Sequence, residues 1–326
     1  MRILSGIQPS GALHIGNYFG MMRPAIALQA EGEAFYFIAE YHALTSVRDP
    51  KTLQAYTRQV AVDFLACGLN PDSGALFRQR DVPQVTELAW ILSTVAPMGL
   101  LERAHSYKDK MARGLAATVG LFSYPVLMAA DILIYDSDVV PVGKDQKQHI
   151  EITRDLAVKM NETYGKSAPD KQIFKLPEPR IQPATEVVPG IDGQKMSKSY
   201  NNNIDIFGDE KETRKRVMSI VTDSAPVEAT KDPSRSTIFQ LYTLFASKDE
   251  IENMRARFEK GGTGYGDFKK ELFEKLWEYF APMRKRREEL LADQAFIDNV
   301  LARGADRANE VADKVMQRVR NAVGLG

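Results

Sequence analysis

The first half of the chain alternates short strand-like runs with helix-like segments, and this alternation limits the possible folds more than any other feature. Residues 2–5 predict a strand, and residues 17–30 predict a helix. Further strands are expected at residues 76–79 and 139–142, and the second of these leads into a helix over residues 144–164. Strands separated by helices indicate a parallel sheet with right-handed crossovers. We therefore expect an α/β fold with a Rossmann-like parallel sheet.

The second half has a different pattern, because helical periodicity dominates it. Residues 165–194 are rich in Pro, Gly and Gln and are interpreted as a connection. The main helices expected after it are Glu210–Val221, Thr237–Ala246, Asp267–Leu291 and Asp293–Val323, with a kink in the third at Pro282. We therefore expect a mostly α-helical C-terminal part.

Residues 11–17, Gly-Ala-Leu-His-Ile-Gly-Asn, lie between the first strand and the first helix. A strand, a glycine-containing loop and a helix start together form an anion site, because free N–H groups and the helix dipole point at the ligand. Gly16 would let adenine or phosphate approach the backbone, and His14 would donate hydrogen bonds to phosphate oxygens. Taken alone, the string is more typical of a plain strand-to-helix turn that carries a surface histidine.

Residues 195–199, Lys-Met-Ser-Lys-Ser, follow a turn-rich stretch at residues 189–194. A loop with two lysines and two hydroxyls suits a leaving pyrophosphate, because ammonium groups placed there stabilise the developing negative charge of the transition state. Departure of pyrophosphate normally involves Mg²⁺ as well. The alternative is a solvated basic loop. We call residues 195–199 the lysine loop.

The pair of strings resembles the two ATP-handling signatures of class I aminoacyl-tRNA synthetases. Residues 6–11, 124–133, 142–155 and 261–269 resemble the bacterial-type tryptophanyl-tRNA synthetases, and the resemblance covers essentially the whole length. It implies ATP-dependent activation of L-tryptophan to tryptophanyl-adenylate, with release of pyrophosphate. Transfer to the terminal adenosine of tRNA(Trp) would follow.

The resemblance also implies the site residues. Charge stabilisation in catalysis is assigned to His14, Lys195 and Lys198. ATP contacts are assigned to Gln8, Ser10, His14, Gly16, Asn17, Gly143, Asp145, Lys195, Met196, Ser197, Lys198 and Ser199. Tryptophan contacts are assigned to Leu4, His42, Tyr124, Met128, Asp131, Val140, Val142 and Gln146. We expect no protein metal site, with Mg²⁺ accompanying the ATP phosphates.

Asp131 carries the selectivity hypothesis. It sits beside an apolar helix run, where an unpaired carboxylate would be costly. In the family, the aspartate at this position accepts the indole N–H, and a buried acceptor rejects side chains that cannot donate. The alternative for Asp131 is a helix-terminal or salt-bridged carboxylate. For His42 the alternative is a structural histidine, and for Met128 and the valines it is plain core.

The chain departs from the best-known members of the family at several positions. Leu4 stands where many carry a phenylalanine over the indole, and residues 105–107, His-Ser-Tyr, replace a more usual Thr-Gln-Phe. Tyr200 and residues 201–203 follow the lysine loop, where an aspartate and a proline often occur. These differences leave the reaction intact and bear on pocket shape and loop dynamics.

Composition limits the partners. The 326 residues carry no net charge, so any tRNA site must be a local patch. Candidates are residues 284–287, residues 214–216, and a third group made of Arg103, Lys108, Lys110 and Arg113. Each alone is more typical of a solvated helix face. The resemblance favours residues 284–287, because anticodon contacts are made in the C-terminal helical region.

The cysteine content and the apolar runs bear on the cellular location and the oligomeric state of the chain. Cys67 is the only cysteine, so internal disulfides and a cysteine zinc cluster are excluded and a reducing cytoplasm fits. No apolar run approaches the ~20 residues that a membrane span requires. The resemblance implies a homodimer, and the apolar run at residues 88–101 is compatible with its interface.

The expected organisation combines pattern and resemblance. We expect a Rossmann-like catalytic domain at residues 1–185, including a connecting insertion at about 80–130, then a linker with the lysine loop at 186–200. A helical anticodon-binding domain at 201–292 and a C-terminal helix at 293–326, packing back on the catalytic domain, would follow. The rival functions are a tyrosyl-tRNA synthetase, a synthetase-like binding protein and, more distantly, a nicotinamide-linked oxidoreductase.

Overall fold

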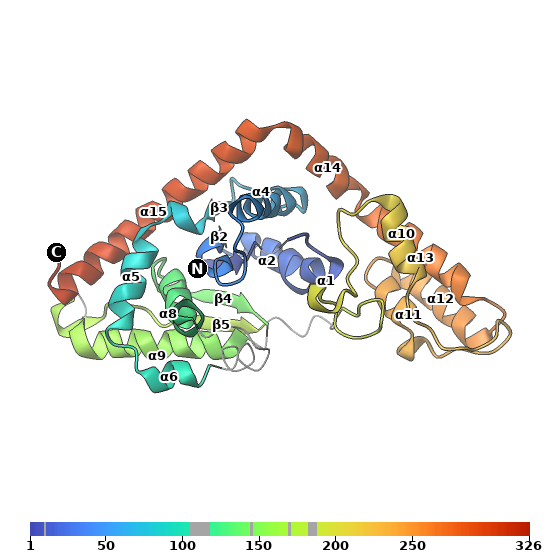
Figure 1. The fold of residues 1–326 in the computed structure, drawn as a ribbon, viewed down its shortest axis with the longest axis horizontal. Helices are drawn as coiled ribbons and strands as arrows, with labels where there is room; N and C mark the ends of the chain where they lie inside the picture. The colour runs from blue at the N-terminus through green and yellow to red at the C-terminus, as the bar shows by residue number, and fades with distance from the viewer. Residues whose placement is uncertain (10, 105–117, 144–145, 169–170, 182–187) are drawn as a thin grey trace. The chain divides into compact units, whose positions relative to one another are not determined.

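The computed structural model describes residues 1–9, 11–104, 118–143, 146–168, 171–181 and 188–326. It divides into two compact units. The first contains Met1–Gly11, Ala25–Pro183 and Asp293–Gly326, and the second contains Ala12–Pro24 and Ala184–Ala292. Figure 1 labels the elements of both.

The first unit is built on a five-stranded sheet in the order β3-β2-β1-β4-β5. Every neighbouring pair of strands is parallel. The strands are β1 (Arg2–Ile7), β2 (Glu33–Ile38), β3 (Gly74–Arg78), β4 (Val139–Val142) and β5 (Glu178–Ile181). This confirms the predicted Rossmann-like parallel sheet. The interpretation of residues 165–194 as connection was wrong at β5, because pairing with β4 forms a short strand that its own pattern does not reveal.

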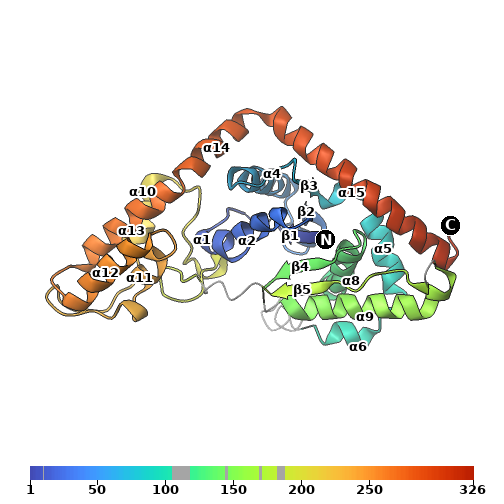
Figure 2. The same cartoon turned by 180° about the vertical axis from the view of Figure 1, so that it is seen from behind.

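The helices of the first unit cover this sheet. They are α3 (Glu40–Ala43), α4 (Pro50–Ala66), α5 (Gln84–Ser93), α6 (Met98–Glu102), α8 (Val119–Leu133), α9 (Lys147–Tyr164) and α15 (Gln294–Val323). Figure 2 shows α8 and α9 beside β4 and β5. Local sequence sets the start of α4. The Asp49 side chain accepts a hydrogen bond from Thr52 N at 2.8 Å, and Pro50 occupies the first turn.

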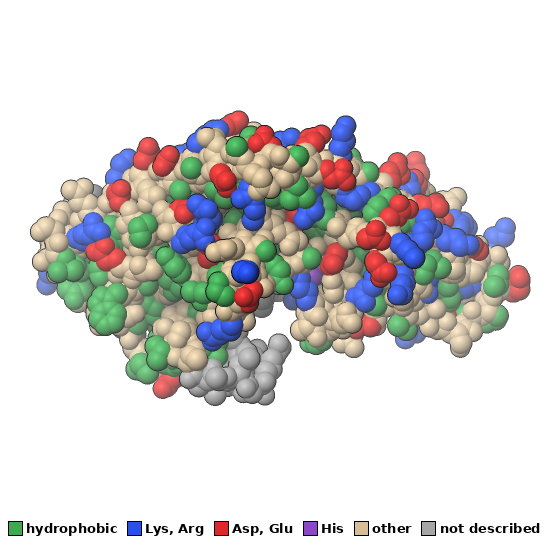
Figure 3. All heavy atoms as spheres, turned by 45° about the horizontal axis from the view of Figure 1, so that its top comes forward, with side chains coloured by type: hydrophobic (Ala, Val, Ile, Leu, Met, Phe, Trp, Pro, Cys, Tyr) green, Lys and Arg blue, Asp and Glu red, His purple; other side chains and the backbone are tan. Residues whose placement is uncertain are grey.

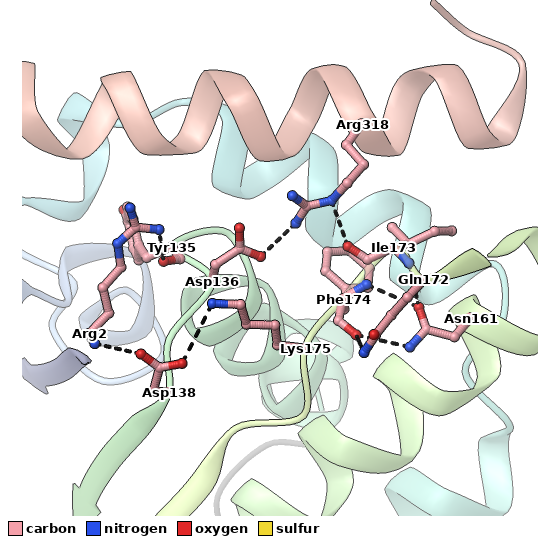
Figure 4. Close-up of polar contacts among 10 residues, drawn as sticks. All are labelled: Arg2, Tyr135, Asp136, Asp138, Asn161, Gln172, Ile173, Phe174, Lys175 and Arg318. Carbon is pink, nitrogen blue, oxygen red and sulfur yellow. Dashed lines mark hydrogen bonds and ion pairs between the residues drawn. The ribbon is translucent and has the colours of Figure 1, made fainter. Parts of the chain in front are cut away.

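The C-terminal helix α15 packs along β3. A Cβ added to Gly304 would lie 2.0 Å from the Leu76 carbonyl oxygen, so only glycine permits this approach. Farther along, Arg318 donates to Ile173 O at 2.7 Å and to Asp136 Oδ1 at 2.5 Å, as Figure 4 shows. Within the same close-up, the Asn161 side-chain oxygen accepts from Ile173 N at 2.8 Å. The close approach at Gly304 and the hydrogen bonds of Arg318 hold the last helix against its own unit.

The second unit is mostly helical. It contains α1 (Ile15–Asn17), a π-helical turn at Tyr18–Met22, α10 (Glu210–Met218), α11 (Thr237–Tyr242), α12 (Lys248–Lys260), α13 (Tyr265–Tyr279) and α14 (Ala281–Ala292). The predicted helix over residues 267–291 is two helices, which part at Phe280. Helix α12 was missed, although Ser247 and Glu250 form a capping box that marks its start.

Among the helices of the described residues, none combines the length and the apolar character needed to cross a bilayer.

Candidate functional site

His14 is buried at the start of α1, where it caps the helix. Its Nδ1 accepts a hydrogen bond from Asn17 N at 3.3 Å, and its own N–H donates to Asn17 Oδ1 at 3.1 Å. Burial, together with the nearby charge of Lys198, lowers the pKa of His14 to about 4, against an opposing effect of Asp205. The imidazole is therefore neutral near pH 7. Because Nδ1 accepts, the ring proton lies on Nε2, which is free of the capping interaction and is suited to donate to an anion.

The second unit brings the two sequence strings together. Ile15 N donates to Ile204 O at 2.9 Å, and Ile206 N donates to Leu13 O at 3.0 Å. A Cβ on Gly16 would lie 3.0 Å from His14 Nδ1 and 3.3 Å from the Met196 Cβ. The histidine string and the lysine loop are therefore packed against each other.

The lysine loop itself is ordered by short-range contacts. Met196 N donates to Val188 O at 2.9 Å, and the Met196 side chain is buried. Ser197 Oγ accepts from Ser199 N at 3.3 Å and lies 2.8 Å from Ser199 Oγ. Lys195 is exposed, whereas Lys198 is half-buried and burial lowers its pKa against the opposing effect of Asp205. Met196 thus anchors the loop, and the two lysines supply its charge.

Asp131 of α8 forms the polar centre of the first unit. It is 1% exposed, and its Oδ2 lies 2.8 Å from His42 Nε2. Gln79 Nε2 donates to Oδ1 at 2.8 Å and to Oδ2 at 2.9 Å. Burial raises the pKa of this carboxyl, while the hydrogen bond and charge of His42 and the hydrogen bond of Gln79 oppose the rise. The Asp131 carboxyl is therefore paired and held in a defined orientation.

Gln79 was missed by the sequence analysis. It follows directly on β3, is 1% exposed, and its Oε1 accepts from Tyr41 N at 2.9 Å. Ligand-binding residues gather at the carboxyl ends of parallel strands. The position of a polar residue immediately after β3 could therefore have identified Gln79 as a candidate site residue.

His42 and Tyr124 line a pocket of about 340 Å³ in the first unit. Their rings meet edge to face with centroids 6.4 Å apart. The Tyr124 hydroxyl lies 2.7 Å from His149 Nε2, and burial raises the pKa of Tyr124 to about 12. The remaining lining residues are Tyr41, Leu44, Thr45, Arg48, Thr118, Gly120, Ser123 and Leu127.

The other predicted residues have varied environments. Leu4 and Val140 are buried in the hydrophobic core, and Met128 and Val142 pack against it while partly exposed. Gln146 N donates to Gly143 O at 3.0 Å. Ser10 and Asp145, like the sequence departure at residues 105–107, lie outside the described residues. Gln8 is exposed, and its amide donates to Ser46 Oγ at 3.2 Å.

The basic runs proposed for tRNA are partly engaged within the second unit. The Arg284 guanidinium stacks 3.6 Å from the Trp277 ring centroid, and that of Arg287 lies 4.9 Å from the Phe207 ring. Lys285 between them is exposed. On the face drawn in Figure 3, basic and acidic side chains are interspersed, in keeping with the absence of net charge.

Known proteins place this architecture in a family. Residues 1–281 match the family described as tRNA synthetases class I (W and Y). Because the match spans most of the chain, the chain belongs to this family of class I synthetases.

Individual relatives narrow the assignment. A tryptophan–tRNA ligase of Rhodopirellula baltica is 54% identical over 325 residues, covering 100% of both proteins. One of Fusobacterium nucleatum is 51% identical over 324 residues, covering 99% of this chain and 98% of the relative. The crystal structure of tryptophanyl-tRNA synthetase from Campylobacter jejuni, complexed with ADP and tryptophan, is similar with a TM-score of 0.94 and 48% identity, covering 100% of both chains. Within the class I family the chain therefore belongs with the tryptophan–tRNA ligases, as the sequence predicted.

Proposed function

We propose that this chain activates L-tryptophan with ATP and loads it onto tRNA(Trp). In the first step the tryptophan carboxylate attacks the α-phosphate of ATP and pyrophosphate leaves. The terminal adenosine of the tRNA then attacks the carbonyl of tryptophanyl-adenylate, and AMP leaves. The observation that carries the proposal is the packing of His14 against the lysine loop within one unit. The full-length similarity to tryptophan–tRNA ligases supports the same activity.

Adenylate formation needs positive charge and hydrogen-bond donors on the leaving group, and the second unit offers both. The neutral His14 would donate a hydrogen bond from Nε2 to a phosphate oxygen. Lys195 and Lys198 would stabilise the negative charge that develops on pyrophosphate. The ADP bound by the Campylobacter jejuni relative supports a nucleotide site here.

Asp131 would select tryptophan by accepting the indole N–H. Among the hydrogen bonds of the described residues, its Oδ1 accepts one, from Gln79, and a carboxylate oxygen offers two acceptor positions. A second position on Oδ1 thus suits a donor from the substrate. His42 and Tyr124 line the adjacent pocket, which suits them to contact the rest of the amino acid.

Mg²⁺ would accompany the ATP phosphates. Among the described residues no group of three or more His, Cys, Asp or Glu side chains is arranged to hold a metal ion. Phosphate oxygens and water would therefore supply most of its ligands, which is the usual binding mode of this ion.

The proposal includes a cytoplasmic homodimer. Trp90 and Met98 are large apolar side chains that are 73% and 63% exposed. They lie in the apolar run at residues 88–101, where exposed apolar surface favours association. Sedimentation of the purified chain would test the dimer, and Trp90→Lys should shift it toward the monomer.

Tryptophan-dependent exchange of radioactive pyrophosphate into ATP, without tRNA, tests the function directly. Exchange with tryptophan alone among the common amino acids is the expected result, and charging of total tRNA should follow. Lys195→Ala and Lys198→Ala should each slow exchange while tryptophan binding persists. Exchange with tyrosine instead would refute the specificity, and unchanged exchange in both lysine variants would refute the catalytic assignment.

A further inference from the structure

Arg216 lies on α10, in the basic run that sequence analysis offered as a tRNA contact, yet its guanidinium faces the segment that follows the lysine loop. Its Nε donates to Asn203 O at 3.0 Å. Its Nη2 donates to Asn201 O and to Asn203 O, each at 2.8 Å. Asn201 has a positive φ of 49°, so the chain turns sharply at this residue. Arg216 therefore holds the two residues on either side of Asn202.

Asn202 in turn holds the lysine loop. It is 1% exposed, and its Oδ1 accepts from Ser197 N at 2.7 Å. Its Nδ2 donates to Lys195 O at 3.1 Å and to Asp192 Oδ1 at 2.8 Å. A Cβ on Gly190 would lie 2.3 Å from the Asn202 Cγ, so the amide is seated in a space that only glycine leaves open. One buried side chain thus sets the backbone positions of both Lys195 and Ser197.

The same segment then joins the histidine string. Ile204 and Ile206 pair with Ile15 and Leu13 through backbone hydrogen bonds. Residues 201–206 consequently touch the lysine loop at one end and the His14 segment at the other, and Arg216 binds the first part of this segment. A planar guanidinium with donors in a rigid fork can hold two carbonyls at once, which a lysine ammonium does less well.

We propose that Arg216 is a positioning residue for adenylate formation. It acts through Asn202, which holds Lys195, and through Asn201, whose N–H donates to Lys198 O at 3.0 Å. This role rests on the proposed synthetase function and assigns Arg216 to the ATP step instead of to tRNA binding. Loss of the contacts should let the lysine loop leave its productive position. The penalty should then appear in the chemistry with ATP and before any tRNA is present.

The test compares Arg216→Gln and Arg216→Lys with Lys211→Gln, a matched loss of charge at an exposed residue of the same helix. Wild-type exchange with tryptophan is measured first. Folded enzyme is counted by equilibrium dialysis with tryptophan, so that reduced folding is not mistaken for reduced turnover. Pyrophosphate exchange without tRNA then gives kcat and the KM values for ATP and tryptophan.

Arg216→Gln should lower kcat for exchange per folded molecule by about tenfold or more, since hydrogen bonds from a charged group are lost. The KM for tryptophan should stay within about twofold, and Arg216→Lys should recover part of the rate. Lys211→Gln should exchange like the wild type. If Arg216→Gln fails to fold, Asn202→Ser tests the next step of the same pathway, the hydrogen bonds from the Asn202 side chain to the lysine loop, and should show the same split between kcat and KM.

Contrary outcomes are distinct. If Arg216→Gln, or Asn202→Ser in its place, exchanges normally, the positioning role is refuted. A raised KM for tRNA in Arg216→Gln, alongside normal exchange, would indicate that Arg216 binds tRNA instead. A wild type that exchanges with no amino acid would refute the synthetase function itself, and the positioning role with it.

Discussion

Replacing Gln79 by methionine removes the amide that donates to both oxygens of the buried Asp131 carboxylate. Methionine approximately conserves volume, so packing costs stay small. Hydrogen bonds to a charged group contribute about 1.5–3 kcal/mol, and at a site 1% exposed water does not readily replace them. We therefore expect a loss of about 2 kcal/mol in the free energy of unfolding at pH values where Asp131 is ionised.

The loss should depend on pH in a defined direction. Burial raises the folded-state pKa of Asp131, so stability is greatest below the unfolded-state pKa and falls as pH rises through the folded-state pKa. Without Gln79 the folded-state pKa rises further, and ionisation costs more. The destabilisation of Gln79→Met, followed over a range of rising pH, should therefore grow.

Urea denaturation followed by circular dichroism across this range measures the effect, with Gln54→Met as the same substitution at an exposed residue. The control should stay within about 0.5 kcal/mol of the wild type at every pH. The kcat/KM ratio for tryptophan over its benzothiophene analogue, which lacks the indole N–H, should also fall about tenfold in Gln79→Met. A variant as stable as Gln54→Met, or a loss that shrinks with rising pH, would show that Gln79 does not support the ionised carboxylate.

Three further outcomes are expected. Gly304→Ala should destabilise the fold by about 3 kcal/mol or more, because the new Cβ meets the Leu76 backbone. Gly266→Ala, in open space within a helix, should not destabilise it. Thermal unfolding of the two variants measures the difference. The NMR resonances of the His14 ring should not titrate between about pH 5.5 and 7.5, and a midpoint near 6.5 would contradict its burial. The stability linked to this group should fall only as pH drops below its unfolded-state pKa of 6.5 toward its folded-state pKa of about 4. EDTA should stop pyrophosphate exchange and added Mg²⁺ should restore it, while tryptophan binding measured by dialysis continues in both conditions.

Local patterns predicted those elements whose signals lie within a few residues. Alternation of strands with helices indicated a parallel sheet, and helical periodicity indicated α10, α11 and α15. The short strand β5 and helix α12 were not recognised, although α12 carries a capping box at its start. A four-residue strand owes its conformation to the neighbour it pairs with, so its own sequence is a weak indicator.

The sequence by itself determined the family, the parallel sheet and the two strings that point to ATP, because these depend on residue identity and order. Only the tertiary structure decided how those residues are supported. Gln79, directly after β3, reaches Asp131 on helix α8, and the segment around Asn202 joins Lys195 to Arg216. Such contacts unite side chains and carbonyls from separate segments, and neither spacing nor composition records which buried donor meets which acceptor.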